Sequence, residues 1–367
     1  MKRALLVANF NSFHRQFNMP YIERLKQKGY EVSLVSGGSN EFNGIANKYD
    51  ISFDRTPYHF KNIKSFFQLR KVYSTYYDLI YISTSVVGGF ARLALIGKKH
   101  GRVIYSAHGY NFYKEGNTTC GKFYIPIEYV LSKLCDCIFT MNKEDYEATL
   151  RYKFPCKEIY NVDGVGIDIT RFKKLGHSEK MVLRDEYGYD KDDFILFYAA
   201  ELTSRKNQIE LLNIIKLLKE NNKKVKLLLA GDGIESDNYR AAAKEKGVDD
   251  SVVFLGFRRD VPRLLQLSDV LFASSINEGL PINMIEGMAT GLPVIATKVR
   301  GHVDLVTDGY NGYLFEIGDS KKACADITRL VDDRELYDSL SDHAIEMSKK
   351  YDITNVVPQY DKIWGFE

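Results

Sequence analysis

Short, nearly continuous apolar runs that alternate with amphipathic stretches constrain this fold more than any other feature of the chain. Strands that are apolar on both faces and separated by helices predict parallel sheets covered on both sides. Two such series in 367 residues predict an α/β chain with two doubly wound domains. The runs are 4–10, 31–36, 78–83, 102–107, 137–142 and 158–163 in the first series, and 194–200, 224–231, 251–256, 269–275 and 292–297 in the second.

The polar segment 164–180 separates the two series of predicted strands. We expect an N-terminal domain over 1–170 and a C-terminal domain over 171–349, with a last helix at about 350–367 that returns to the first domain. No apolar run reaches the roughly 18–20 residues that a membrane-spanning helix needs. The start MKRALLVANF fits a strand better than a signal peptide, and five cysteines without a C-x-x-C pair fit reduced thiols. These features predict a cytoplasmic protein.

The two halves of the chain differ in charge. Residues 1–150 hold 20 Lys and Arg against 12 Asp and Glu, or +8, whereas the remainder holds 31 against 36, or −5. A basic first half indicates an anionic partner, or else an unevenly charged surface in water. Nucleic acid is disfavoured because no reading motif accompanies the basic residues. No dinucleotide fingerprint, Walker loop or zinc-site spacing occurs, so no cofactor or metal is expected.

Polar residues directly follow several predicted strands, where parallel sheets gather their ligand-binding groups. Arg205 and Lys206 begin a helical pattern, where the helix dipole disfavours cations. The two residues would either bind a diphosphate or lie in solvent as a basic pair. His108 fits either a sugar-binding or a structural histidine. The residues that follow strands are Asn9, Asn11, Ser12, His14 and Arg15, then His108, and in the second half 201–206, Gly231, Phe257, Arg258 and 278–281.

The stretch SINEGLPINMIEGMATGLPVIAT, 275–297, places Glu286 among apolar and small residues. Pro281 suits the first turn of a helix, and the N–H groups around Ile282 then form an anion site. Glu278 lies just before this helix and Glu286 lies one turn inside it. A carboxylate in such surroundings needs hydrogen-bond donors. Sugar or ribose hydroxyls would supply them, and the alternative is a bond to neighbouring backbone.

Several segments resemble, in order and spacing, the retaining glycosyltransferases of family four. They are LLLAGDG, VVFLGFRRDVPRLLQLSDVLFASS, NEGLPINMIEGMATGLPVIAT and GHVDLVTDGYNGYLF. The resemblance covers nearly the whole chain and is strongest over 194–316. HGYNFY and GVGID resemble a bacterial subgroup that makes exopolysaccharide, capsule, lipopolysaccharide or lipid-linked glycans. The resemblance implies the GT-B fold, in which two Rossmann-like domains face a central cleft.

The resemblance also implies an activity. The chain would transfer a hexose or N-acetylhexosamine from a nucleotide sugar of the UDP type to a lipid-linked or glycan acceptor. The transfer would retain configuration and need no metal. Glu286 would hold the ribose, Glu278 and His108 would contact the donor sugar, and Lys206 would neutralise the diphosphate.

Further contacts follow from the same resemblance, and two positions depart from it. Glu201 stands where many members carry arginine, which leaves Arg205 as the candidate for that charge, and Asp304 stands where the family often has glutamate. The implied contacts are the base at Phe257 and Arg258, the donor at Gly231, Gly279, Leu280, Pro281 and Ile282, and the acceptor or a phosphate in a loop with Asn11, Ser12, His14 and Arg15.

Two basic and aromatic segments, 58–77 and 110–134, suit the interface of an anionic membrane. We therefore expect an acceptor on a polyprenyl diphosphate and a protein docked peripherally on the inner face of the cell membrane. The alternative is that both segments form ordinary core helices. Two other functions stay open, a UDP-sugar 2-epimerase of the same fold and an inactive sugar-nucleotide-binding partner subunit. Glu201 and Asp304 are the residues that keep the second open.

Overall fold

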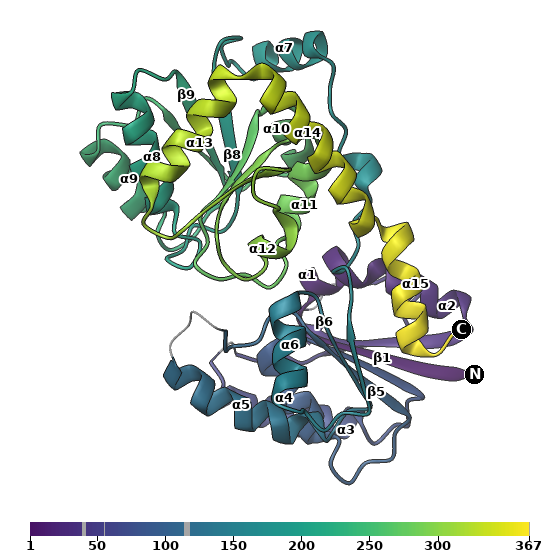
Figure 1. Ribbon diagram of the computed structural model, residues 1–367. Helices are drawn as coiled ribbons and strands as arrows, with labels where there is room; N and C mark the ends of the chain where they lie inside the picture. The colour runs from purple at the N-terminus through teal and green to yellow at the C-terminus, as the bar shows by residue number, and fades with distance from the viewer. Residues whose placement is uncertain (39–41, 55, 114–117, 367) are drawn as a thin grey trace. The chain divides into compact units, whose positions relative to one another are not determined.

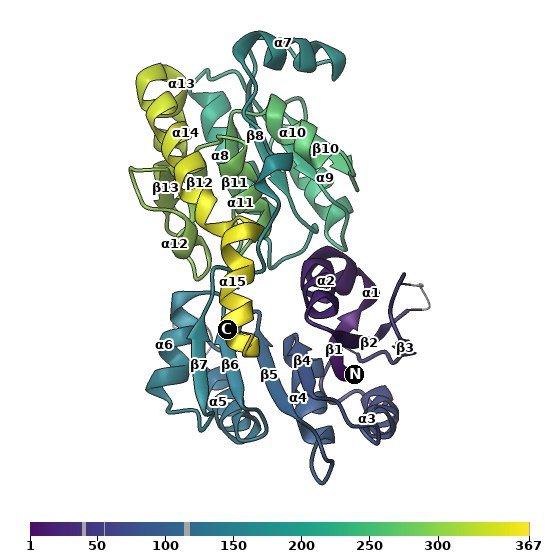
Figure 2. The same ribbon diagram turned by 90° about the vertical axis from the view of Figure 1, so that its right-hand side faces the viewer.

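The computed structural model describes residues 1–38, 42–54, 56–113 and 118–366, except the side chains of 118–120. The chain divides into two compact units, one of Met1–Gly166 with Thr354–Glu367 and the other of Ile167–Ile353. Figures 1 and 2 show a sheet flanked by helices in each unit. None of the helices within the described ranges combines the length and apolar character needed to cross a membrane.

The first unit contains a seven-stranded parallel sheet in the order β3-β2-β1-β4-β5-β6-β7. The strand order therefore reverses between β1 and β4. The strands are β1 (Lys2–Phe10), β2 (Tyr30–Gly37), β3 (Asn47–Asp50), β4 (Leu79–Ser83), β5 (Arg102–Ala107), β6 (Cys137–Thr140) and β7 (Glu158–Asn161). The helices are α1 (Asn11–Phe13), the π-helix η1 (His14–Asn18), α2 (Met19–Gln27), α3 (Lys61–Val72), α4 (Ser85–Ala94), α5 (Thr118–Ser132), α6 (Lys143–Arg151) and α15 (Ile353–Trp364).

The second unit contains a six-stranded parallel sheet in the order β10-β9-β8-β11-β12-β13, which reverses between β8 and β11. The strands are β8 (Phe194–Ala199), β9 (Val225–Ala230), β10 (Val252–Gly256), β11 (Val270–Ala273), β12 (Val294–Thr297) and β13 (Gly312–Phe315). The helices are η2 (Ile169–Arg171), α7 (His177–Glu186), α8 (Gln208–Glu220), α9 (Ser236–Glu245), α10 (Val261–Leu267), α11 (Ile282–Ala289), α12 (His302–Leu305), α13 (Ser320–Asp332), α14 (Arg334–Ser348) and η3 (Lys349–Tyr351).

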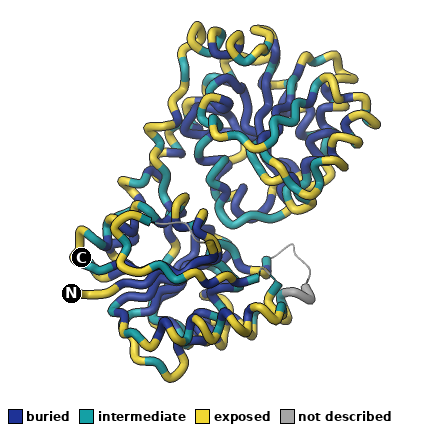
Figure 3. The backbone as a smooth tube through the Cα atoms, turned by 180° about the vertical axis from the view of Figure 1, so that it is seen from behind, coloured by how far each residue is buried: buried dark blue, intermediate teal, exposed yellow. Residues whose placement is uncertain are grey.

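The strands form the core of each unit because their apolar runs are covered on both faces. Figure 3 shows buried strands in the middle of each unit and exposed residues on the outer helices. Every residue of β4 and of β11 is buried. Residues 31–36 and 102–107, expected to be strands, lie in β2 and β5. The expected α/β class with two parallel sheets is therefore confirmed.

The C-terminal helix α15 packs on the first unit through aromatic and charged contacts. Tyr360 stacks on Tyr21 with ring centroids 4.0 Å apart, and Asp361 pairs with Arg24. Arg102, on β5, donates to the backbone oxygen of Ile363. These contacts fix the end of the chain on the sheet of the first unit.

Three local expectations were incomplete or wrong. The edge strands β3 and β13 were not predicted, because β3, with the sequence NKYD, lacks an apolar run and β13, with the sequence GYLF, has only three apolar residues in a row. The predicted loop after β1 is instead the helical pair α1 and η1. Contacts four residues apart hold this turn: Phe13 packs edge-on against Phe17, and the Asn18 amide bonds the His14 ring.

Candidate active site

In the second unit, the loops that follow β8 and β11 meet at the point where the strand order reverses. Open parallel sheets bind ligands at this kind of position. The backbone N–H of Ile276 donates to the Arg205 oxygen at 2.9 Å, and the Ser274 hydroxyl donates to the Lys206 oxygen at 2.9 Å. The two loops are therefore fastened together by hydrogen bonds.

Glu278 forms ion pairs with both Lys206 and Arg205, which lie in the loop that follows β8. Its Oε1 lies 2.5 Å from the Lys206 ammonium, and its Oε2 lies 3.2 Å from the Arg205 guanidinium. Burial alone would raise the pKa of Glu278, but Lys206 and then Arg205 outweigh it and lower the pKa to about 2. Two cations around one carboxylate leave a net positive charge, and half of the Arg205 side chain is exposed. This cluster can therefore take up an anionic group.

Two further residues hold the Glu278 loop, and sequence reasoning missed both. The Ser275 hydroxyl donates to Glu278 Oε1 at 2.6 Å. Arg300 donates to the Glu278 backbone oxygen at 2.9 Å and to the Asn277 side chain at 2.8 Å. Arg300 lies just beyond β12, so the rule that polar residues follow strands would have found it. Close backbone packing completes the support, since a Cβ on Gly301, at φ +82°, would lie 2.5 Å from the Gly279 oxygen.

Helix α11 carries Glu286 one turn from its start. Pro281 is the residue before the helix, and it gives the first turn no side-chain cap. The amide of Asn283 bonds the Ala199 oxygen at 3.0 Å, which ties this turn to the end of β8. The first N–H groups of a helix have no partner within it, so the turn from Ile282 onward can bind an anion. Leu280 is partly buried and packs against the core of the unit.

The Glu286 carboxyl is half-buried and has no hydrogen-bond partner among the described residues. Burial raises its pKa from the usual 4.5 to about 7, and the charge of Arg171 opposes this only in part. A buried polar group without a partner costs free energy. Within the described residues, the Glu286 carboxyl therefore does not make the hydrogen bond to neighbouring backbone that the sequence left open as the alternative to a ligand with hydroxyl groups.

The loops after β9 and β10 lie beside each other at the same edge of this sheet. The Gly231 N–H donates to the Gly256 oxygen at 2.8 Å, and the Phe257 N–H donates to Asp232 at 2.9 Å. The Phe257 ring is exposed, whereas the Arg258 guanidinium is paired with Asp260 at 2.5 Å. An exposed ring and backbone groups are therefore the features that this loop offers to a flat ligand.

In the first unit, His108 follows β5 directly. Its Nε2 lies 3.1 Å from the Ser106 hydroxyl, and the Phe13 ring meets it edge-on at 5.0 Å. Burial lowers the pKa of His108 from 6.5 to about 4, so the ring is neutral at pH 7. A neutral imidazole can donate one hydrogen bond and accept another.

The residues expected in the loop after β1 differ in exposure. His14 is fully buried, with Nε2 3.1 Å from the Val35 oxygen and Nδ1 3.0 Å from the Asn18 amide. Asn11 is also buried and accepts from the Ser36 hydroxyl at 2.6 Å. Only Ser12 and Arg15 are exposed, and the Arg15 guanidinium lies over the Phe42 ring. His14 and Asn11 therefore shape the turn, while Ser12 and Arg15 face solvent.

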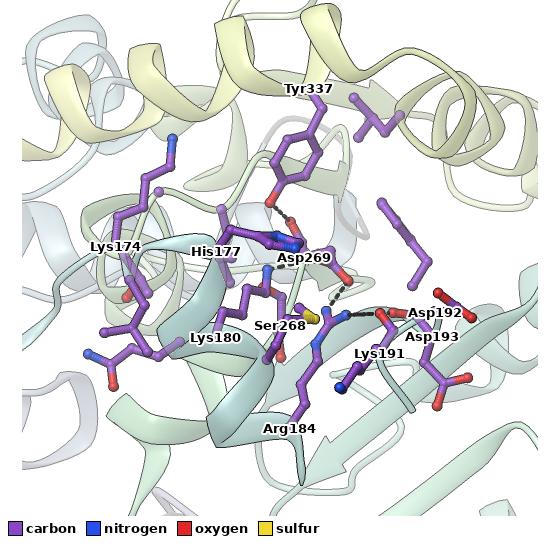
Figure 4. Close-up of a pocket in the computed structure, with 18 of the residues that line it drawn as sticks. Lys174, His177, Lys180, Arg184, Lys191, Asp192, Asp193, Ser268, Asp269 and Tyr337 are labelled. Carbon is purple, nitrogen blue, oxygen red and sulfur yellow. Dashed lines mark hydrogen bonds and ion pairs between the residues drawn. The ribbon is translucent and has the colours of Figure 1, made fainter. Parts of the chain in front are cut away.

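A cavity of about 540 Å³ lies at the opposite, amino-terminal ends of the strands of the second unit. Figure 4 shows Arg184 and Lys180 of α7 directed at Asp269, which precedes β11. Asp269 accepts from Arg184 at 2.5 Å, from Lys180 at 2.6 Å and from the Ile195 N–H at 2.7 Å. These charged groups satisfy one another, in contrast to Glu286. The network ties α7 to the sheet.

Two family models match this chain. The model described as "Glycosyl transferases group 1" matches residues 179–347, and the one described as "Glycosyl transferase 4-like" matches residues 3–142. The chain is 36% identical over 367 residues to the "Putative glycosyltransferase EpsD" of Bacillus subtilis, covering 99% of this chain and 96% of that protein. It is 25% identical to the "UDP-Gal:alpha-D-GlcNAc-diphosphoundecaprenol alpha-1,3-galactosyltransferase" of Escherichia coli, over 75% of this chain and 72% of that one.

Solved structures share the architecture. The crystal structure of Anabaena Alr3699/HepE in complex with UDP and glucose has a TM-score of 0.80, at 19% identity, with both chains fully covered. That of WaaG, a glycosyltransferase involved in lipopolysaccharide biosynthesis, has a TM-score of 0.76, at 16% identity, over 98% of this chain and 99% of that one. Together with the two parallel sheets, these matches confirm the GT-B fold.

Proposed function

This chain is a glycosyltransferase of family four, and we propose that it transfers a hexose or N-acetylhexosamine from a UDP-sugar to a lipid-linked or glycan acceptor in cell-surface polysaccharide synthesis. The half-buried Glu286 carboxyl without a protein partner is the observation that carries this proposal. The names of relatives support the substrates. The Escherichia coli relative acts with UDP-Gal on a diphosphoundecaprenol, and a Campylobacter jejuni relative is named for another diphospho-undecaprenol acceptor.

The donor would bind along the carboxyl edge of the second sheet. Glu286 would accept hydrogen bonds from the two ribose hydroxyls, which would give its half-buried carboxyl the partners that the described residues do not supply. The diphosphate would lie at the start of α11, close to Lys206 and Arg205, because the helix dipole and both cations favour negative charge there. Glu278 would hold these cations in place and contact the donor sugar. The exposed Phe257 loop would border the base.

Arg205 can supply the positive charge that many members of the family carry at the position of Glu201. Glu201 is exposed, and its backbone oxygen accepts a hydrogen bond from the Gln208 side chain at 3.0 Å. Arg205 already reaches Glu278 and has half of its side chain in solvent. We propose that Arg205 provides the second cation of the diphosphate site. The site would then keep two cations although position 201 carries a carboxylate.

The reaction would proceed with retention at the anomeric carbon and without a metal. The bond between that carbon and the diphosphate oxygen breaks while the acceptor oxygen bonds the same face, and the acceptor proton passes to the departing diphosphate. Cations and helix N–H groups would stabilise the charge that develops on the leaving group. For His108 we propose a hydrogen bond to the reacting sugar from its neutral ring. The similarity to transferases along 99% of the chain favours transfer over epimerisation or inactive binding.

We also propose that helices α3 and α5 of the first unit dock on an anionic membrane. Each helix buries one side and exposes large apolar side chains on the other: Phe67 is 64% exposed and Phe123 is 69% exposed. Lys61 and Lys64 are also exposed on α3. Exposed rings and lysines together suit the headgroup region. Part of the segment 110–134, namely 114–117 and the side chains of 118–120, lies outside the described residues.

Vesicle flotation tests the docking proposal. Vesicles with phosphatidylglycerol should recover more protein than neutral vesicles, and replacing Lys61, Lys64 and Lys71 by alanine should abolish the difference. Arg70 is left intact because it donates to the Ile96 oxygen at 2.9 Å. Replacing three exposed lysines of the second unit, Lys191, Lys244 and Lys321, by alanine provides the matched control. Equal recovery from both kinds of vesicle would refute the docking proposal.

A thermal-shift screen of nucleotides and nucleotide sugars tests the transferase proposal. A ligand that binds the native state raises the melting temperature by mass action. UDP and at least one UDP-sugar should stabilise the wild type, and neither should stabilise Glu286→Ala. Stabilisation by GDP-sugars instead would overturn the choice of base. No shift with any nucleotide would contradict the donor site as a whole.

A further inference from the structure

A cavity of about 410 Å³ lies at the amino-terminal ends of the last three strands of the first unit. The residues that line it precede β5, β6 and β7 in the chain, within 95–100, 133–136 and 155–157. His108 follows β5 directly, so it lies at the opposite edge of the same sheet. The proposed transfer therefore makes no use of this cavity.

Two cysteines lie together at the wall of this cavity. Cys135 lines it and is 8% exposed, and Cys156 is half-buried between the lining residues Pro155 and Lys157. The two sulfur atoms are 4.0 Å apart and share a hydrogen bond. A disulfide holds its sulfurs at about 2.0 Å, so these two would have to approach by roughly 2 Å. The thiols are therefore neighbours that a small movement can join.

Both cysteines lie in turns and not inside a strand or a helix. Cys135 lies between α5 and β6, and Cys156 lies between α6 and β7. The Glu158 N–H donates to the backbone oxygen of Asp136 at 3.1 Å, and the Lys157 ammonium lies 2.6 Å from the Asp136 carboxylate. These bonds hold the two turns side by side, and turns adjust more readily than strands. The sulfurs can therefore approach each other while the sheet stays intact.

The two thiols differ in how readily they react. The hydrogen bond from the Cys135 thiol lowers the pKa of Cys156, although burial opposes this. The same bond, together with burial, raises the pKa of Cys135. Cys137 is fully buried at the start of β6, and burial raises its pKa as well. Thiol–disulfide exchange starts from an accessible thiolate. Cys156 is therefore suited to attack first and Cys135 to attack second.

The charge at the cavity indicates which kind of molecule it attracts. Within the described residues, the lining carries three lysines and one carboxylate, namely Lys98, Lys133, Lys157 and Asp136. Lys157 is paired with Asp136, which leaves two lysines in excess. Such an excess of positive charge raises the local concentration of anions. An anionic reagent would therefore meet these thiols more often than a neutral or cationic one.

We propose that Cys135 and Cys156 form a reversible disulfide by exchange with an anionic low-molecular-weight disulfide that docks at this cavity. The Cys156 thiolate attacks one sulfur of that molecule, the S–S bond breaks, and the released thiolate takes up the proton that Cys156 lost. Cys135 then bonds the Cys156 sulfur, and its proton passes to the second released thiolate. Two protein thiols are oxidised, and one disulfide is reduced to two thiols. The bridge would join the turn after α5 to the turn before β7.

Mass spectrometry of the full chain, incubated with oxidised glutathione, tests the pair. Trypsin should release the peptides 134–143 and 154–157 of the wild type as a disulfide-linked pair. Cys135→Ser should stop at a mixed disulfide of glutathione on Cys156. Cys156→Ser should react at least about tenfold more slowly at the peptide 134–143, because its remaining thiols are buried. Cys324→Ser, in the second unit, is the matched control and should react like the wild type.

Three results would overturn the pair. A linked pair of peptides that persists in Cys135→Ser would show that Cys137 is the partner. Glutathione held on Cys156 of the wild type, without any linked peptides, would show that Cys135 cannot reach it. Reaction of the wild type only after addition of urea would show that both thiols are inert in the folded chain. Thermal melting checks that each serine variant is folded.

Charge variants test the choice of an anionic reagent. Lys133→Gln combined with Lys157→Gln should slow exchange with oxidised glutathione about fivefold, because two positive charges are lost. Exchange with cystamine, a cationic disulfide, should be no slower in this variant. Lys191→Gln combined with Lys321→Gln, exposed in the second unit, is the matched control and should change neither rate. Equal slowing with both reagents, or no slowing with glutathione, would overturn the docking of an anion.

Discussion

Replacing Glu286 by glutamine should stabilise the second unit at high pH and weaken donor binding. The folded unit raises the pKa of this carboxyl from the usual 4.5 to about 7, mainly because it is buried. Between these values the folded state holds a proton that the unfolded state releases, so stability falls as pH rises through this window. The difference of about 2.5 corresponds to about 3 kcal/mol, at about 1.4 kcal/mol for each tenfold change.

Glutamine mimics the protonated carboxyl at every pH. Glu286→Gln should therefore raise the free energy of unfolding by about 3 kcal/mol at pH 8 and by almost nothing at pH 4.5. Its affinity for UDP should fall about tenfold, because an amide offers one acceptor oxygen where a carboxylate offers two. A residue that opposes stability and supports binding is expected at a functional site.

Urea unfolding followed by circular dichroism, at pH 4.5 and pH 8, measures this effect. The shift should appear in the transition of the second unit. Glu245→Gln, on the exposed face of α9, is the matched control and should change stability by less than about 0.5 kcal/mol at either pH. An equal gain at both pH values, or no gain at pH 8, would refute the claim that Glu286 is a half-buried acid whose pKa is raised in the folded unit.

Three further predictions follow from the same site. Lys206→Ala leaves Glu278 with Arg205 alone, and calorimetry should show about 10- to 100-fold weaker UDP binding, since a hydrogen bond to a charged group contributes about 1.5–3 kcal/mol. Burial lowers the pKa of His108 to about 4, so this ring should not titrate between pH 6 and 8. His108→Gln should therefore lower kcat without changing the shape of its pH profile in this range. If the wild type showed a titration near pH 6.5 that His108→Gln lost, this prediction would be contradicted. Treatment with EDTA should leave the transfer rate within about twofold, and a loss restored only by a divalent cation would contradict transfer without a metal.

The fold was largely predictable from the sequence because buried parallel strands form short, nearly continuous apolar runs. Short runs such as FILFYAA and KVKLLLAG, which alternate with amphipathic stretches, favour strands of a sheet covered on both faces. The edge strand β3 escaped because its residues, NKYD, are polar and only partly buried. The turn after β1 escaped because its helical winding depends on pairs such as His14 with Asn18. A pattern of apolar residues does not record such a polar pair.

The sequence predicted which residues lie at the site, but it did not predict the contacts between them. The rule of polar residues after strands found Lys206 and Glu278, which the structure brings to 2.5 Å. That rule does not reveal that the two groups neutralise each other, because Glu278 reaches back across the strand reversal. Ser275 and Arg300 also follow strands, so the same rule could have named them, but only the folded chain shows that they hold Glu278 in position.

Calorimetric titration of uridine, UMP and UDP into the wild type, Glu286→Ala and Lys206→Ala tests the central claim most directly. If Glu286 holds the ribose and Lys206 the diphosphate, Glu286→Ala should weaken all three ligands by a similar factor. Lys206→Ala should weaken UDP strongly and leave uridine unchanged. Uridine binding that survives in Glu286→Ala would contradict the assignment of this carboxylate as the ribose ligand.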